Sequence, residues 1–221
     1  MAHEIRNPLN SIAGFAQLLQ MKVEEADPRR KFVDIIVQEA FRIDTLISDI
    51  LDFAHQKKTV ITDIDFGQLT NKVVSAKKDA AQKKGATLAC TATPGLPPVR
   101  GDSVRLERVL LNLVNNALDA TESGGAVTVA AAPAESGGIP GIQLTVADTG
   151  CGIPPEHLEA VFKPFFTTKQ TGTGLGLAIV QKIAEEHNGT VSVASAPGRG
   201  TSFTVFLPAA TDLSPTPLLK H

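Results

Sequence analysis

Residues 5–23 read IRNPLNSIAGFAQLLQMKV, and residues 33–54 read VDIIVQEAFRIDTLISDILDFA. Apolar residues recur in both stretches at steps of four and three, which is the a/d heptad pattern of an amphipathic helix. In the first stretch they are Ile5, Leu9, Ile12, Ala16, Leu19 and Val23, and in the second Val33, Ile36, Ala40, Ile43, Ile47, Ile50 and Ala54. Because Asp27-Pro28 separates the two stretches, the pattern predicts an antiparallel helical hairpin.

The apolar stripe of this hairpin is wider than one seam. Phe15, Leu18, Phe32 and Ile35 lie outside the a/d positions, and a lone hairpin cannot bury so broad a surface. We therefore expect a homodimer in which two hairpins form a four-helix bundle. The alternative is that the hairpin packs against the rest of its own chain.

The heptads stop near residue 57, and helical and strand patterns alternate beyond it. We predict strands near 60–66, 86–93, 127–131, 142–147, 190–194 and 202–207, and helices over 67–84, from Asp102 or Ser103 to 120, and from 176 to 187. The fold class is α+β: an N-terminal antiparallel helical hairpin is followed by a two-layer α/β sandwich whose mixed sheet carries helices on one face. The predicted domains are 1–57 and 58–208, with a flexible tail at 209–221.

Composition excludes several classes of protein. The 221 residues carry 21 Lys and Arg against 23 Asp and Glu, a net charge of −2, and no basic run that could neutralise a nucleic-acid backbone. No stretch is long and apolar enough to be a membrane segment, and the two cysteines lack metal-ligand spacing. We expect a cytoplasmic location, either free or as the cytoplasmic part of a larger, membrane-attached sensor.

Two glycine-rich stretches follow predicted strands or open predicted helices. In DTGCG at 148–152, a carboxylate at a strand end can accept from an exocyclic amine while the glycines let backbone approach a flat ring. In GTGLGL at 172–177, the first backbone N–H groups of a helix favour a phosphate. Each stretch alone is equally consistent with an ordinary turn.

Two amides share one face of the helix predicted to end near residue 120. Asn112 and Asn116 are four positions apart, so they lie one turn apart on the helix surface. Neutral amide oxygens suit Mg²⁺, which takes few protein ligands besides phosphates and water. A solvated polar face is the alternative for this pair alone.

Taken together, five stretches in order resemble the catalytic core of a two-component sensor histidine kinase, over nearly all of residues 2–208. HEIRNPL at 3–9 resembles its phosphoacceptor box, NLVNNA at 112–117 its asparagine box, and FKPFF at 162–166 its phenylalanine box. DTGCG and GTGLGL resemble its two glycine boxes. The resemblance implies a dimerisation and histidine-phosphotransfer hairpin followed by an ATP-binding domain of the kind shared with gyrase, Hsp90 and MutL.

The resemblance also implies a role for individual residues. His3 would accept the phosphoryl group of ATP, Glu4 would orient its imidazole or take its proton, and Asn7 would position water for dephosphorylating a partner's aspartate, so that the chain could also act as a phosphatase. Asn116 and secondarily Asn112 would hold Mg²⁺. Asp148 would read the adenine amino group with support from Thr201. The remaining nucleotide-binding residues implied are Gly150, Gly152, Gly172, Gly174, Leu175 and Gly176.

The sequence departs from the family pattern at two places. Many members have a Lys three residues after the metal-binding asparagine, whereas this chain has Asp119 at that position. In this respect the chain resembles the nitrogen-regulation and sporulation-type branch of the family. We expect Lys169, in the predicted lid, to supply the phosphate contact instead. His3 is only the third residue, so we expect a frayed first turn, a weakened dimer and poor self-phosphorylation.

The expected function is an ATP-dependent protein-histidine kinase that passes its phosphate to a response regulator. Two alternatives stay open. One is an ATPase of the same fold, although its water-activating Glu is replaced by Asn112. The other is a nucleotide-binding dimerisation and docking module without kinase activity.

Overall fold

The computed structural model describes residues 2–54, 60–169 and 172–210, except the side chains of residues 2–6, 45, 49 and 52–54. The chain forms two compact units. One comprises Met1–Lys57 with Thr167–Leu175, and the other comprises Lys58–Phe166 with Gly176–His221. Of the tail predicted at 209–221, residues 211–221 lie outside the described residues. The backbone N–H groups of Ala209 and Ala210 donate to the carbonyl oxygens of Pro140 and Pro98, so these two residues pair with the second unit rather than forming a loose tail.

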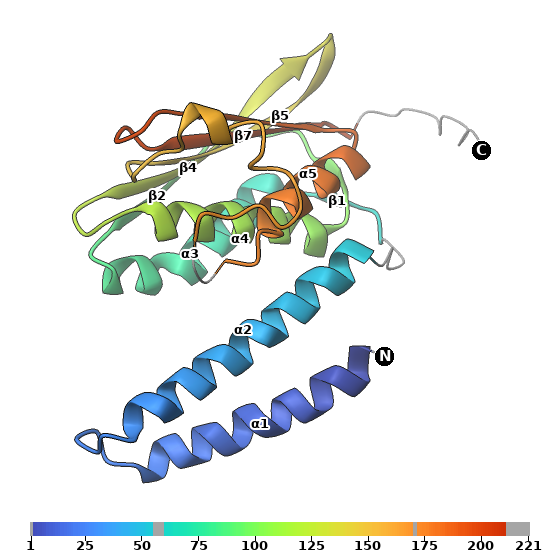
Figure 1. Ribbon diagram of the computed structural model, residues 1–221. Coiled ribbons are helices and arrows are strands. Elements are labelled where there is room, and N and C mark those ends of the chain that lie inside the picture. Colours follow the sequence, from blue (N-terminus) through green and yellow to red (C-terminus); the bar gives the residue numbers. More distant parts are fainter. Residues whose placement is uncertain (1, 55–59, 170–171, 211–221) are drawn as a thin grey trace. The chain divides into compact units, whose positions relative to one another are not determined.

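The first unit contains the predicted antiparallel helical hairpin (Figure 1). Its helices are α1 (Ala2–Lys22) and α2 (Arg30–Ala54). Helix α1 continues through Pro8, which cannot donate a backbone hydrogen bond. Among the described residues, none of the helices is both long enough and apolar enough to cross a membrane.

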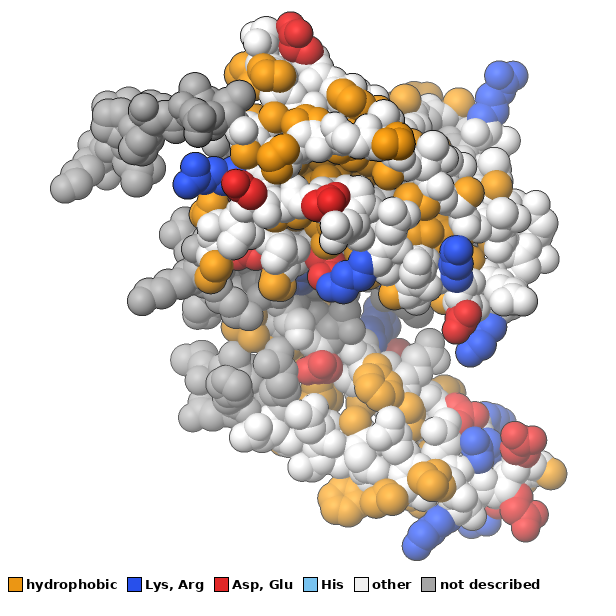
Figure 2. Space-filling view, turned by 180° about the vertical axis from the view of Figure 1, so that it is seen from behind, with side chains coloured by type: hydrophobic (Ala, Val, Ile, Leu, Met, Phe, Trp, Pro, Cys, Tyr) orange, Lys and Arg blue, Asp and Glu red, His pale blue; other side chains and the backbone are white. Residues whose placement is uncertain are grey.

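Within the hairpin, only one of the two sets of apolar heptad positions is buried. One set of positions seven residues apart is buried between the helices and includes Leu9, Ala16, Val33 and Ala40. The other set remains 43% to 53% exposed: Ile12, Leu19, Ile36, Ile43 and Ile50. Figure 2 shows such apolar side chains gathered along the hairpin surface. The hairpin therefore presents a second apolar seam that its own two helices do not cover.

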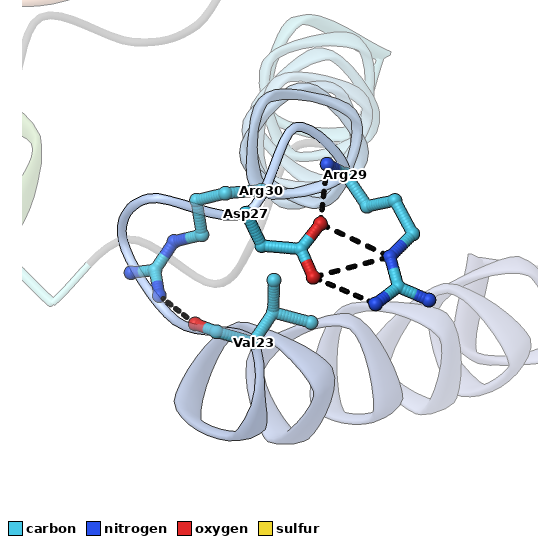
Figure 3. A network of polar contacts seen from close by, with 4 residues as sticks. All are labelled: Val23, Asp27, Arg29 and Arg30. Atoms are coloured by element: carbon cyan, nitrogen blue, oxygen red, sulfur yellow. Dashed lines mark hydrogen bonds and ion pairs between the residues drawn. The ribbon is translucent and has the colours of Figure 1, made fainter.

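The turn between α1 and α2 is held by charged side chains (Figure 3). Asp27 accepts from the Arg29 backbone N–H at 2.8 Å and from Arg29 Nη2 at 2.7 Å, and these bonds lower the pKa of Asp27 to about 2. Arg30 Nη1 donates to the carbonyl oxygens of Gln20 and Val23 at 2.6 and 2.7 Å. A cation thus satisfies carbonyl groups left unpaired at the end of α1.

The second unit is a two-layer α/β structure. Its five-stranded sheet has the order β2-β4-β5-β7-β6, with β2 parallel to β4 and the other neighbours antiparallel. The strands are β2 (Thr87–Ala92), β4 (Ala126–Ser136), β5 (Ile139–Asp148), β6 (Thr190–Ser195) and β7 (Thr201–Pro208). Helices α3 (Phe66–Lys83), α4 (Ser103–Ala120) and α5 (Gly176–Glu186) cover one face (Figure 1). The predicted α+β class is confirmed.

The core lies between this sheet and its helices. Alternate residues of β4, β5 and β7 point inward in matched register, as in the pairs Val129↔Val146 and Val146↔Phe203. Helix α4 contributes Leu106, Leu110 and Leu113, which are completely buried. Because α4 runs through the centre of the core, its remaining face is fixed in position relative to the strand ends.

Three features differ from the predicted elements. A short strand, β3 (Val99–Gly101), pairs with β1 (Thr62–Ile64), although no strand is predicted between residue 93 and α4. Strands β4 and β5 extend to a tight hairpin at Gly137-Gly138, beyond the predicted 127–131 and 142–147. The loop before α5 contains a 3₁₀ turn over Pro155–His157.

Candidate functional site

Asp148 is the last residue of β5 and has its carboxylate anchored by backbone. It is buried, and its Oδ1 accepts from the N–H of Gly150 at 2.8 Å and of Thr201 at 3.2 Å. Two backbone donors stabilise the ionised form and fix the carboxylate plane. The strand ending, the following turn and the first residue of β7 together orient one acidic group at the edge of the sheet.

The loop after Asp148 contacts the end of α4 on one side and the turn before β7 on the other. A Cβ on Gly150 would collide with the carbonyl oxygen of Ala120 at the end of α4, so only glycine fits there. On the other side, the N–H of Gly198 donates to the carbonyl oxygen of Cys151 at 2.7 Å. Gly152 has a φ of 73°, which favours glycine, and packs against Ala196. The predicted residues Asp148, Gly150, Gly152 and Thr201 are therefore brought together.

A hydroxyl that the sequence analysis did not single out joins these segments. Ser195, at the end of β6, accepts from the N–H of Ile153 at 2.8 Å and donates to the carbonyl oxygen of Gly200 at 2.8 Å. Its Oγ also lies 2.9 Å from Oγ1 of Thr201. Ser195 thus connects the loop after β5 with the turn that precedes β7.

Helix α4 carries the two predicted amides. The helix starts at an N-cap, Asp102, whose side chain accepts from the N–H groups of Val104 and Arg105. Asn112 and Asn116 are half-buried and lie four positions apart, so they share one face of the helix. Asn112 Nδ2 donates to the carbonyl oxygen of Gly176 at 3.2 Å, so its amide is oriented by the first residue of α5.

The second glycine-rich stretch leads into α5 as predicted. Gly174 has a φ of 68°, and Thr173 Oγ1 accepts from the N–H of Leu175 at 3.2 Å. Helix α5 begins at Gly176. The predicted residues Lys169, Gly172, Gly174 and Leu175 belong to the first compact unit, Gly176 belongs to the second, and residues 170–171 lie outside the described residues. The predicted phosphate contact from Lys169 therefore stays a prediction.

Aromatic side chains stand along the loop before this stretch. Phe162 packs edge-on against Phe203 of β7, with 6.1 Å between ring centroids, and Phe166 packs against His157. Phe165 has a φ of 66° and is 66% exposed. A bulky residue in left-handed backbone is uncommon, which makes this loop conformationally distinctive.

The candidate phosphoacceptor lies at the start of the hairpin. Because α1 begins at Ala2, His3 and Glu4 lie in its first turn, and their side chains are outside the described part of the chain. Asn7 lies one turn further on and is exposed, with its carbonyl oxygen accepting from Ser11 Oγ at 3.2 Å.

Two further residues support α4 at its ends. Lys84 Nζ donates to the carbonyl oxygens of Leu118 and Asp119, at 2.6 and 3.4 Å. At the other end, His187 Nε2 accepts from the N–H of Asp102 at 3.1 Å. Sequence reasoning missed both because each contact joins residues far apart in the chain, and neither residue sits in a local motif.

The residues of this site offer a small set of oxygen donors for a magnesium ion. Among the described residues, no three His, Cys, Asp or Glu side chains gather where they could hold a metal. Asn112 and Asn116 each offer an amide oxygen. The amide nitrogen of Asn112 donates to the carbonyl oxygen of Gly176, which leaves the amide oxygen of Asn112 as the atom that could bind a metal ion. Such a sparse oxygen set fits Mg²⁺, which fills its other positions with phosphate oxygens and water.

Two family models match the chain. Residues 101–211 match the histidine kinase-, DNA gyrase B- and HSP90-like ATPase model, and residues 1–58 match the His Kinase A phospho-acceptor domain. The chain is 38% identical to the sensor histidine kinase ZraS of Escherichia coli K12 over 94% of its own length and 44% of that protein. It therefore spans less than half of ZraS.

Relatives from other bacteria are similar over the same region. The sensory histidine kinase/phosphatase NtrB of Rhodobacter capsulatus is 37% identical over 95% of this chain and 61% of that protein. Sporulation kinase C of Bacillus subtilis is 34% identical over 96% of this chain and 48% of that protein.

Two solved structures are similar to the whole chain. Full-length ShkA in complex with AMPPNP has a TM-score of 0.76 and 31% identity, covering 96% of this chain and 46% of ShkA. The histidine kinase ThkA in complex with the response regulator protein TrrA has a TM-score of 0.69 and 28% identity, covering 95% of this chain and 60% of that one.

Proposed function

The chain belongs to the two-component sensor histidine kinases, and we propose that it transfers the γ-phosphoryl group of ATP to His3 and from there to an aspartate of a response regulator. In this proposal residues 1–57 dimerise and carry the phosphoacceptor, and residues 58–208 bind ATP. The observation that carries it is the anchored carboxylate of Asp148 beside Thr201, in a domain of this ATPase family.

Asp148 would read the base of the nucleotide. Its Oδ1 is already held by two backbone N–H groups, so the carboxylate is preorganised to accept a hydrogen bond from the adenine amino group. The glycine positions in the loop keep side chains away from the flat ring. Binding would then need little rearrangement of this part of the site.

Magnesium would be held by Asn116 and secondarily by Asn112, on the face of α4 next to the start of α5. When bound, the ion would neutralise charge on the phosphates. The N-terminal N–H groups of α5 favour negative charge through the helix dipole. The chain's own part is to hold the triphosphate between these two helices.

Transfer would use the neutral imidazole of His3 as nucleophile. A ring nitrogen attacks the γ-phosphorus, the bond to the bridging oxygen breaks, and ADP leaves with that oxygen. Glu4 takes the proton from the other ring nitrogen, which keeps the phosphorylated ring neutral. A receiver aspartate then displaces the imidazole from phosphorus. In the opposing phosphatase function, Asn7 would orient a water molecule that attacks the aspartyl phosphate, so that the aspartate leaves and inorganic phosphate is released.

Two partners are proposed for the chain: a second copy of itself and a response regulator. The hairpin's open seam of isoleucine and leucine side chains supports a homodimer, as does the match to the phospho-acceptor domain model. A response regulator is supported by the complex of ThkA with TrrA.

The test is incubation with γ-labelled Mg-ATP, followed by acid and alkali treatment of the labelled protein. A histidine kinase gives acid-labile, alkali-stable label that is lost in His3→Gln. Release of labelled phosphate without labelled protein would indicate an ATPase instead. Bound nucleotide with neither product would indicate a docking module.

A further inference from the structure

The hydroxyl of Ser195 has its hydrogen-bonding capacity completely used by protein groups. A serine hydroxyl offers one hydrogen and two lone pairs. The carbonyl oxygen of Gly200, 2.8 Å away, can only accept, so the hydrogen of Ser195 points to it. One lone pair accepts from the N–H of Ile153 at 2.8 Å. Thr201 Oγ1, at 2.9 Å, must therefore be the donor to the second lone pair.

Ser195 and Asp148 form hydrogen bonds to opposite ends of the same peptide group. The Gly200–Thr201 peptide has its C=O bound by Ser195 and its N–H bound by Asp148 Oδ1 at 3.2 Å. Gly200 has a φ of 80°, and a Cβ there would collide with the carbonyl oxygen of Asp148. The hydrogen bonds form a continuous chain from Ile153 through Ser195 to Asp148, and bonds in such chains polarise one another.

This arrangement fixes what the site can offer to a base. The hydrogen of the Thr201 hydroxyl is committed to Ser195, so Oγ1 can only accept from a ligand. The carboxylate of Asp148, whose Oδ1 accepts from two backbone N–H groups, can also only accept. A 6-amino purine presents an N–H₂ donor at this edge, whereas a 6-oxo purine presents a carbonyl acceptor. The acceptor atoms of Asp148 and Thr201 therefore attract a 6-amino group and repel a 6-oxo group.

We propose that Ser195 is a positioning residue that orients Asp148 and fixes Thr201 as an acceptor, and thereby selects 6-amino over 6-oxo purine nucleotides. The inference rests on the proposed binding of ATP at this loop. Ser195 does not touch the base in this arrangement. It acts through the Gly200–Thr201 peptide and through the Thr201 hydroxyl.

The test compares ADP with GDP in the full 221-residue chain, by displacement of a fluorescent ADP derivative. Ser195→Ala removes the donor to Gly200 and frees the Thr201 hydrogen. We expect ADP to bind about tenfold more weakly, the size of one hydrogen bond, and GDP to change less than about twofold. The ADP-to-GDP ratio therefore falls several-fold. Ser195→Thr, which keeps the hydroxyl, restores it.

Ser192→Ala is the matched control, because Ser192 is an exposed serine on the same strand. Ser195→Cys is a second variant that keeps the side-chain shape with a weaker donor, and it should lower the ratio by a smaller factor. Equal weakening of ADP and GDP by Ser195→Ala would show a merely structural role and overturn the inference, as would an unchanged ratio. If the unmodified chain binds no ADP, the proposed function itself fails.

Discussion

His187 is a buried histidine that the fold holds in its neutral form. Its Nε2 accepts from the N–H of Asp102 at 3.1 Å, so the hydrogen of the ring must be on Nδ1, which donates to the carbonyl oxygen of Ile183 at 2.7 Å. Burial lowers the pKa of His187 below its usual 6.5, and the charge of the nearby Arg105 lowers it further. The hydrogen bond to Ile183 and the negative charge of Asp102 each raise the pKa, but by less than burial lowers it. A second ring proton would face the backbone N–H of Asp102.

We expect the stability of the second unit to fall in mild acid because of this residue. With the folded pKa below the unfolded value of 6.5, the unfolded chain binds more protons between the two values, so the free energy of unfolding decreases as pH falls from about 6.5. Urea unfolding at pH 7.5 and 5.5 measures this difference. His187→Gln should cost about 1 to 3 kcal/mol at pH 7.5 and reduce the pH dependence. An identical pH dependence in the variant would contradict the assignment.

Cys151 provides a second prediction about a single residue. Its side chain is exposed in the loop between Gly150 and Gly152, beside the anchored Asp148. Bound nucleotide should cover the thiol, so ADP should slow its alkylation several-fold. Cys90 is the internal control, since it lies on β2 and its half-buried thiol has a pKa raised by burial. Equal labelling of Cys151 with and without ADP would show that the base does not bind at this loop.

The carboxyl end of α4 is held by a lysine from another element. Lys84, at the end of α3, donates to the carbonyl oxygens of Leu118 and Asp119, where the helix dipole is negative. Lys84→Met should lower the free energy of unfolding by about 1 kcal/mol, and Lys84→Arg should restore part of it. The measurement is denaturant unfolding, with Lys83→Met as control because Lys83 is an exposed lysine in the preceding position. An equal effect of both Met variants would rule out the capping role.

Elements with strong local patterns could be predicted from the sequence, and those that depend on distant partners could not. The hairpin helices follow from their heptads, and α4 follows from its N-cap at Asp102. Strand β3 has three residues and exists because β1 lies beside it. The predicted strand stops at residue 131, whereas β4 continues through Pro133, a residue type that is uncommon inside sheets. The turn Gly137-Gly138, with both φ values positive, carried the hairpin signal that would have corrected this.

The candidate site likewise combines a local motif that the sequence predicts with distant contacts that it does not. Asp148 and its glycines form a local motif, so their proximity was expected from the sequence. Ser195 is 42 residues from Ile153, and His187 is 85 from Asp102, so no local pattern could pair them. These supports depend on how β6 and α5 pack after the whole domain has folded. The local motif was therefore predictable from the sequence, and the distant residues that orient it were not.

The hairpin has an apolar surface that its own two helices do not cover. A four-helix bundle needs both sets of heptad positions covered, and here one set is buried within the hairpin while Ile36 and Ile43 remain 48% and 43% exposed. A second copy of the chain would cover them. We therefore expect Ile36→Asp, Ile43→Asp and especially the double variant to convert a dimer to a monomer, as measured by analytical ultracentrifugation.

Gln38→Asp is the control, since Gln38 is exposed on α2 and lies at neither seam position. It adds the same charge to the same helix and should leave the dimer intact. ADP affinity should be unchanged in all of these variants, because none of the substituted residues is a proposed nucleotide-binding residue and because Asp148, Thr201, Asn112 and Asn116 lie in the other compact unit. A dimer that survives the double substitution would mean that the open seam is not the interface. Loss of ADP binding together with the dimer would mean that the nucleotide site depends on assembly.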